Sequence, residues 1–290
     1  GDQTYTWYQG EYYPDVLTNG TPYTFTVTTR DINGNLGAAI TIGSTPHEGT
    51  LAQRIAAASS GDTITLYKDE AVPAAIGINK TITLIGYDDT ERTLIIDGYS
   101  GAMFNVAAGG SLTLDEYVTL RGKSGNNASV VTVNGGSLVM KDGSKITGNA
   151  NTANSLAGGV QVNSGMFIMK GGTISDNKGS YASPWRGGGV QVNGGTFKME
   201  GGIISRNSTP GSGGGVGVQN GTFIKSDTTD SDSGTIYGMD GGADKNIMNS
   251  DGGGSDNGYA VFYQNRYRNT TLGPSDDIST ATLTSPPWNQ

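Results

Sequence analysis

The sequence predicts an all-β fold, a right-handed parallel β-helix of about eight turns with three short strands per turn. Three observations lead to this prediction. Glycine provides 48 of the 290 residues and charged residues only 15%, which favours tight turns over long helices. Short runs of alternating apolar and polar residues lie between the turns. A glycine turn recurs at steps of 26 to 30 residues, at Gly110, Gly136, Gly165, Gly195 and Gly221.

Apolar residues that repeat with these turns predict the core. If the turns stack about 4.8 Å apart, each strand pairs with its equivalents above and below, and the inward side chains form continuous columns. The expected columns are Val131/Val160/Val190/Val216, Val133/Val162/Val192/Val218 and Leu138/Phe167/Phe197/Phe223.

Asparagine recurs at one corner of the predicted turn, at Asn149, Asn177 and Asn207. Asparagine tolerates the left-handed backbone conformation, and stacked amides can hydrogen bond along the axis. We therefore expect a structural role for all three. Opposite charges at equivalent positions of neighbouring turns, such as Asp176 and Arg206, predict weak surface pairs.

Both ends of the β-helix need covering, because an open end exposes the core and the strand edges. Residues 50–58 form the one convincing helix, with Leu51 and Ile55 on the same face, and predict an N-terminal cap. Residues 271–274 and 286–288 predict a second cap at the far end.

Residues 1–43 differ from the repeats, so we predict two parts, 1–43 and a β-helix domain over 44–290. The strand pattern at 21–31 and the turn at 33–35 resemble the late strands of a fibronectin type III domain, of which only a fragment would be present. The first residues lack the features of a signal peptide. We expect a mature or excised piece of a longer, modular, secreted or cell-surface protein.

Charge and hydropathy exclude several partners. A net charge of −8 counts against nucleic acids and anionic membranes. No run approaches the ~18 apolar residues of a membrane span. The absence of cysteine excludes disulfides and thiol chemistry. We expect a monomer within its longer chain.

The repeat Gly-Gly-Val-x-Val-x-x-Gly-x-Phe-x-Met-x-Gly-Gly-x-Ile-x-x-Asn resembles the pectin-lyase-like β-helix repeats of secreted proteins from gut and oral bacteria. Residues 91–98 and 233–238 resemble the entry and exit turns of that family. The resemblance covers about 50–290 and implies fold more than function. The family includes adhesins, polysaccharide lyases, hydrolases and non-catalytic carbohydrate-binding modules attached to xylanases of gut Bacteroidetes. It implies xylan as the favoured ligand.

No catalytic residue is predicted. The Asn-Thr-Asp and Arg-Ile-Lys motifs of galacturonan hydrolases on this fold are absent, and the single histidine, His47, precedes the repeats. Asp88–Asp89 and Asp276–Asp277 fit turns as well as they fit catalytic carboxylate pairs. We predict no enzyme, no cofactor and no metal site. Structural Ca²⁺ remains an alternative to a solvated loop for a run of acidic residues: Asp227, Asp230, Asp232, Asp240, Asp244, Asp251 and Asp256.

Aromatic residues outside the repeat pattern provide the candidate binding site, since flat amphipathic rings are common on binding surfaces. Tyr181, Trp185 and Arg186 share one loop; the alternative is that Trp185 folds back over the neighbouring strand. A second, weaker candidate surface contains Tyr259, Tyr263 and Tyr267. At the outward strand positions of the repeats, such as Thr132, Gln161 and Gln191, we expect a shallow hydrogen-bonding surface.

These observations favour a non-catalytic carbohydrate-binding module of a secreted bacterial protein that degrades plant polysaccharides, with xylan as ligand. A surface adhesin or spacer is the first alternative. A polysaccharide lyase or glycoside hydrolase is the second.

Overall fold

The computed structural model describes residues 23–30, 33–44, 49–152, 157–180, 187–210, 213–225, 234–238, 240–248, 260–263, 266–268, 271–273 and 278–279. The chain divides into two compact units, Gly1–Ala57 and Ala58–Gln290. The division at 43/44 that the sequence suggests stays a prediction.

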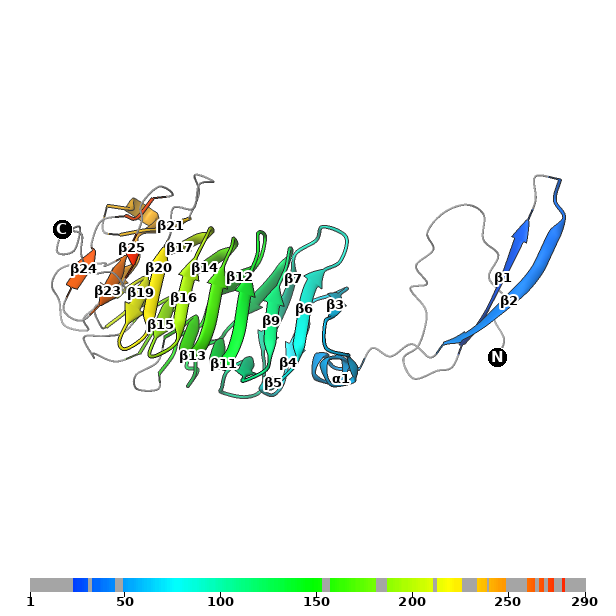
Figure 1. Cartoon of the computed structure of the whole chain (residues 1–290), viewed down its shortest axis with the longest axis horizontal. Coiled ribbons are helices and arrows are strands. Elements are labelled where there is room, and N and C mark those ends of the chain that lie inside the picture. The colour runs from blue at the N-terminus through cyan, green and yellow to red at the C-terminus, as the bar shows by residue number, and fades with distance from the viewer. Residues whose placement is uncertain are drawn as a thin grey trace. The chain divides into compact units, whose positions relative to one another are not determined.

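The first unit contains a hairpin and a short helix (Figure 1). Strand β1 (Tyr23–Arg30) pairs antiparallel with β2 (Leu36–Ser44), and Gly34 in the connecting turn has a φ of 88°, which glycine adopts without strain. A strand and a turn therefore lie where the sequence predicts them.

Helix α1 (Leu51–Ala57) lies within the predicted range, and Leu51 and Ile55 are both buried. Its start is stabilised by reciprocal hydrogen bonds. The backbone N–H of Thr50 donates to Gln53 Oε1 (2.9 Å), and the N–H of Gln53 donates to Thr50 Oγ1 (3.3 Å). That α1 caps the β-helix stays a prediction.

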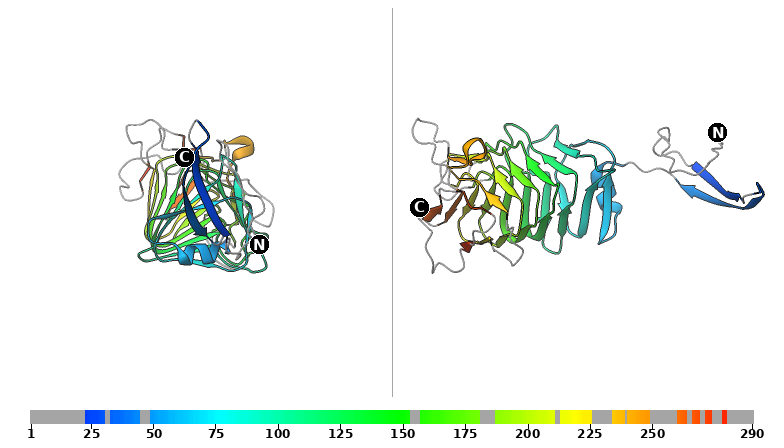
Figure 2. Two further views of the ribbon diagram at one scale, coloured as in Figure 1. Left: turned by 90° about the vertical axis from the view of Figure 1, so that its right-hand side faces the viewer. Right: turned by 90° about the horizontal axis from the view of Figure 1, so that it is seen from above.

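The second unit is a parallel β-helix, which confirms the predicted all-β fold class. Its strands stack as successive rungs and enclose the core when viewed along the stack (Figures 1 and 2). The predicted eight turns are not confirmed. The strands that follow β23 pair antiparallel and add no further turn.

Each turn passes through three faces. Two of them form one continuous sheet, because β11 and β13 bend from one face into the next. Face 1 contains β5 (Ile76–Ile78), β8 (Phe104–Ala107), the first halves of β11 (Val131–Met140) and β13 (Val160–Met169), β15 (Val190–Val192), β19 (Val216–Val218) and β23 (Val261–Tyr263). Face 2 contains β3 (Asp62–Leu66), β6 (Thr81–Gly86), β9 (Ser111–Leu114), the second halves of β11 and β13, β16 (Thr196–Met199) and β20 (Thr222–Lys225).

Face 3 is a separate seven-stranded parallel sheet. It contains β4 (Glu70–Val72), β7 (Arg92–Ile96), β10 (Val118–Arg121), β12 (Lys145–Thr147), β14 (Thr173–Ser175), β17 (Ile203–Ser205) and β21 (Thr235–Ile236). Two short strands, β18 (Ser208–Thr209) and β22 (Ile247–Met248), pair beside it, and a 3₁₀ turn, η1, spans Gly242–Asp244.

The three predicted core columns are confirmed. Strand registers align each column residue with its equivalents, and all twelve side chains are fully buried. In the aromatic column, the ring centroids of Phe167 and Phe197 lie 4.6 Å apart, and those of Phe197 and Phe223 lie 5.1 Å apart. Repetition at a step of one turn therefore brings identical side chains into van der Waals contact.

The chain reverses after β23 and pairs antiparallel with the last strand of each of the three faces. Strand β24 (Arg266–Arg268) pairs with β23 on face 1, Leu272 pairs with Ile236 on face 3, and β25 (Ile278–Ser279) pairs with β20 on face 2. This reversed segment covers strand edges that would otherwise remain open. It includes Thr271–Gly273 of the predicted second cap, whereas residues 286–288 lie outside the described residues.

A buried lysine ties this reversed segment to the core. Lys225 aligns with the inward Met199 of the turn below and is fully buried. Its ammonium group donates a hydrogen bond to the carbonyl oxygen of Gly273 (2.7 Å). Met169 and Met199 hold this inward position in the two preceding turns. Lysine replaces methionine where the stack ends, because backbone carbonyls are available there as acceptors.

Candidate functional site

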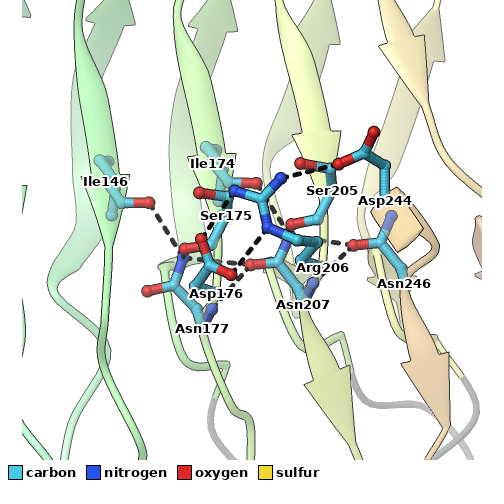
Figure 3. Close-up of polar contacts among 10 residues, drawn as sticks. All are labelled: Ile146, Ile174, Ser175, Asp176, Asn177, Ser205, Arg206, Asn207, Asp244 and Asn246. Carbon is cyan, nitrogen blue, oxygen red and sulfur yellow. Dashed lines mark hydrogen bonds and ion pairs between the residues drawn. The ribbon is translucent and has the colours of Figure 1, made fainter.

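A buried ladder of asparagines follows the corner between faces 3 and 1. We call it the inner ladder; the structure confirms the three predicted residues and adds one at each end. Its five members are Asn126, Asn149, Asn177, Asn207 and Asn246, and each is at most 1% exposed. Figure 3 shows the last three. The amide of Asn126 donates to Asn149 Oδ1 (2.9 Å), and the backbone N–H of Asn149 donates to Asn177 Oδ1 (3.2 Å). The remaining two bonds join side chains. The amide of Asn177 donates to Asn207 Oδ1 (3.1 Å), and the amide of Asn207 donates to Asn246 Oδ1 (3.0 Å).

The left-handed conformation expected for Asn149, Asn177 and Asn207 belongs instead to the residue before each of them. Gly125 before Asn126 shares it, whereas Lys245 before Asn246 has a φ of −55°. Gly125, Gly148, Asp176 and Arg206 have φ values between 52° and 70°, and the asparagines that follow do not have positive φ. The expectation was wrong because the buried amide must point along the axis to bond its neighbour. The chain reversal is therefore made one residue earlier, at a glycine in two turns and at the exposed Asp176 and Arg206 in two others.

Two of these left-handed residues form an ion cluster above the inner ladder (Figure 3). Arg206 donates two hydrogen bonds to the carboxylate of Asp176 (2.9 Å each) and one to Asp244 (2.8 Å). The Arg206 guanidinium lowers the pKa of Asp176, and the two carboxylates raise the pKa of Arg206. The predicted pair of Asp176 and Arg206 is confirmed. Because all three side chains are more than 40% exposed, the cluster adds little stability.

The loop with the leading binding candidates lies outside the described residues, so the proposed roles of Tyr181, Trp185 and Arg186 stay predictions. Its two ends are described. Lys178 forms parallel bridges to Ala150 and Ser208 in the turns on either side, and Gly187 bridges to Gly213. The loop thus starts and ends on backbone that is held by neighbouring turns.

Two outward glutamines beside this loop are buried, which corrects the expected shallow surface. Gln161 and Gln191 are 3% and 0% exposed, whereas Thr132 is half-buried. Gln191 Oε1 accepts a hydrogen bond from the backbone N–H of Gly187 (2.7 Å), where the loop rejoins face 1, while Gln161 Oε1 has no hydrogen-bond partner among the residues that the structure describes. Alternation within a strand predicts which way a side chain points, but it does not predict contacts such as that between Gln191 and Gly187.

The hydrogen-bonding surface lies instead at the corner between faces 1 and 2. Asn163 donates to Asn134 Oδ1 (2.9 Å) and Asn193 donates to Asn163 Oδ1 (3.0 Å), one residue from each of three turns. We call these three residues the outer amide stripe. Asn134 and Asn163 are exposed and Asn193 is half-buried. Gln161 and Gln191 each donate to the asparagine two residues ahead, at 3.0 and 3.1 Å, which holds the stripe from beneath.

The sequence contained the signal for this stripe. Each of these asparagines begins a glycine turn of the repeat, at steps of 29 and 30 residues. Turn chemistry alone accounts for the glycines of the repeat, whereas a polar residue that recurs once per turn at an outward position must form an axial row.

The second aromatic candidate is only partly described. Tyr259 lies outside the described residues. Tyr263 is half-buried on β23, where it pairs with Arg266, and Tyr267 pairs with Phe262. The structure therefore brings the backbones of Tyr263 and Tyr267 together in the hairpin that reverses the chain, and their role as a binding surface stays a prediction.

Most of the acidic run lies outside the described residues. Of its described members, Asp244 pairs with Arg206, and Asp240 Oδ1 accepts hydrogen bonds from the N–H and the hydroxyl of Thr271 (2.6 Å each). Among the residues that the structure describes, no three acidic or histidine side chains are grouped as metal ligands. Structural Ca²⁺ stays untested, because Asp227, Asp230, Asp232, Asp251 and Asp256 are not described.

No family model, curated protein or solved structure matches the chain. In the part of the chain that the structure describes, no helix is long and apolar enough to cross a membrane.

Proposed function

We propose that this β-helix is a non-catalytic polysaccharide-binding module. The observation that carries the proposal is the outer amide stripe, whose three asparagines present donors and acceptors at the spacing of successive turns. That spacing is about 4.8 Å, comparable with the length of one sugar residue. A polysaccharide along the axis would meet an equivalent amide at each step.

Affinity for a sugar ring also needs apolar contact, which the amides do not supply. We assign this contact to Trp185 and Tyr181, with Arg186 as hydrogen-bond donor to hydroxyl or uronic acid groups. Tyr259, Tyr263 and Tyr267 form the secondary candidate surface. Support comes from the backbone bridges of Lys178 and Gly187, which flank this loop, to neighbouring turns.

The absence of catalysis is part of the proposal. Two carboxylates that form ion pairs with basic side chains support it. Lys145, through its hydrogen bond, lowers the pKa of Glu91, and Arg206 does the same for Asp176. A general acid at neutral pH needs a raised pKa, so these two groups are poorly suited to protonate a leaving group.

The proposal has four further parts: xylan as ligand, a right-handed pectin-lyase-like β-helix, capping by α1, and a secreted or cell-surface location. They derive from the sequence pattern and the family resemblance. We infer a module that holds a longer plant-polysaccharide-degrading protein of a gut bacterium on its substrate, without nucleic-acid, membrane or cofactor partners of its own.

Affinity gel electrophoresis on xylan, pectin and alginate tests this function. We expect xylan to retard the protein. Trp185→Ala should weaken binding at least about tenfold, or 1.4 kcal/mol, while the melting temperature stays nearly unchanged. Trp185→Phe keeps an aromatic ring and should keep most of the affinity. A Trp185→Ala variant that loses stability but binds normally would show that Trp185 packs on the strand, and would shift the site to Tyr259, Tyr263 and Tyr267.

A turnover assay distinguishes this function from a lyase or hydrolase. The purified protein should release neither reducing ends nor unsaturated products from the same polysaccharides, with or without Ca²⁺. Activity that survives repurification and disappears with one carboxylate substitution would establish an enzyme. A protein that no polysaccharide retards would instead favour an adhesin or spacer.

A further inference from the structure

Two tyrosines from adjacent turns form an aromatic pair at the corner between faces 2 and 3. The ring centroids of Tyr67 and Tyr87 lie 4.7 Å apart, with the ring planes tilted by 39°. Tyr67 is 54% exposed and Tyr87 is half-buried. Leu66 and Gly86, the buried residues just before them, pair in register on β3 and β6, so alternation along the strands turns both tyrosines outward.

The backbone beneath this pair is held in an uncommon conformation. Asp88 and Asp89 have φ values of 57° and 49°, and the bulky Tyr117 of the next turn has a φ of 60°. Three of the five described non-glycine residues with positive φ therefore gather at this corner. Such conformations cost free energy and persist only where the surroundings enforce them.

Hydrogen bonds supply that enforcement and orient Tyr87. Its carbonyl oxygen accepts from the backbone N–H of Thr90 (3.3 Å) and from Arg92 Nη2 (3.4 Å), and its own N–H donates to Leu66 (3.0 Å). The N–H of Arg92 in turn donates to the carbonyl of Tyr117 (2.7 Å). The Tyr87 backbone is thus fixed before any ligand arrives, which reduces the entropy cost of binding.

The charges around the pair indicate an uncharged ligand. Asp69, Asp88 and Asp89 are exposed and lie within two residues of a tyrosine in the sequence, as does the exposed Lys68. Arg92 is turned inward, since its Nε is buried and its Nη2 contacts the Tyr87 carbonyl. The outward charge is therefore negative, which disfavours anionic sugars. Carboxylates are strong acceptors for hydroxyl groups, and the tyrosine rings supply the apolar face.

We propose that Tyr67 and Tyr87 form a second carbohydrate contact, which stacks a neutral sugar ring and accepts its hydroxyl hydrogen bonds on Asp88 and Asp89. The inference rests on the proposed polysaccharide-binding function and adds a site to it. The pair lies between faces 2 and 3 on the first rungs of face 2, whereas the Trp185 loop joins faces 3 and 1 between β14 and β15. Two separated contacts on one rigid β-helix would bind a long chain more tightly than either does alone.

Fluorine NMR of the whole chain labelled with 3-fluorotyrosine tests the site directly. Tyr67→Phe and Tyr87→Phe assign the two resonances, and xylohexaose, cellohexaose and trigalacturonate serve as probes. We expect the neutral oligosaccharides to shift both resonances, also in a Trp185→Ala background, and trigalacturonate to leave them in place. Tyr67→Ala should weaken the affinity for the neutral oligosaccharides, measured by titration of the Tyr87 resonance, at least about fivefold. The melting temperature should not change. Tyr67→Phe keeps the ring and should keep most of the affinity.

The possible results separate this inference from the proposed function. Xylan binding that depends on Trp185, with silent Tyr67 and Tyr87 resonances, would overturn the second site and leave the function intact. Shifts of both resonances with unchanged binding by Trp185→Ala would support the second site and overturn the loop assignment. A stronger response to trigalacturonate than to the neutral probes would overturn the proposed ligand class. No retardation by any polysaccharide together with silent resonances would overturn both proposals.

Discussion

Replacement of Phe197 by alanine is expected to lower the free energy of unfolding by about 3–5 kcal/mol. Phe197 lies in the middle of the aromatic column, with ring centroids 4.6 Å from Phe167 and 5.1 Å from Phe223, and its side chain is fully buried. The turns above and below are held by parallel backbone pairing, so they cannot collapse into the cavity without breaking register. Most of the lost packing should therefore appear as lost stability, measured by chemical denaturation.

Lys198→Ala is the matched control, because Lys198 is the next residue on the same strand and points outward. Its side chain is 36% exposed and pairs with Glu200. We expect a change within about ±0.5 kcal/mol. Equal losses in the two variants would contradict the argument that the aromatic column, rather than the strand as a whole, determines the effect.

Asn207→Ala is expected to cost at least about 3 kcal/mol, although it removes only a short polar side chain. The Asn207 amide donates to the carbonyls of Ile174 (2.9 Å) and Ser205 (3.0 Å) and to Asn246 Oδ1 (3.0 Å). Its Oδ1 accepts from the backbone N–H and the amide of Asn177 (3.1 Å each). Alanine would leave several of these buried groups without a partner, each at a cost of about 1–3 kcal/mol.

Two further variants test whether the buried hydrogen bonds cause this loss. Asn134→Ala removes one exposed hydrogen bond of the outer amide stripe and should change stability by no more than about 0.5 kcal/mol. Asn207→Asp keeps the shape but buries a carboxylate against three oxygen acceptors. Its destabilisation should be greater at neutral pH than near about pH 4, where the carboxylate can take up a proton. A pH-independent loss equal to that of Asn134→Ala would refute the role of the inner ladder.

The core could be predicted from the sequence because the signal repeats. Val160, Val190 and Val216 occupy the same place in successive repeats, and stacking of equivalent strands is the arrangement that buries all of them. The same reasoning predicted the inner ladder. It placed the left-handed residue one position too late, because periodicity locates a corner without saying which residue makes the turn.

The binding surface could be predicted only in part. Gln161 and Gln191 hold outward positions of their strands, yet they are buried. Gln191 accepts a hydrogen bond from the backbone of Gly187, a contact that alternation within the strand does not predict. The pairing of Tyr67 and Tyr87 also escaped the sequence analysis. They lie 20 residues apart, outside the 26 to 30-residue step of the glycine turns. Each follows directly after a strand, β3 or β6.

The sequence by itself determined the parallel β-helix, its inward columns and its asparagine corner, because these features depend on contacts between equivalent positions, which a repeat specifies. Only the tertiary structure decided how the stack ends and what covers its faces. Reversal of the chain against β20, β21 and β23, burial of Lys225 under Gly273 and the proximity of Tyr67 to Tyr87 each join segments that are not equivalent. Such contacts depend on loop lengths and chain direction over many residues, which local pattern does not encode.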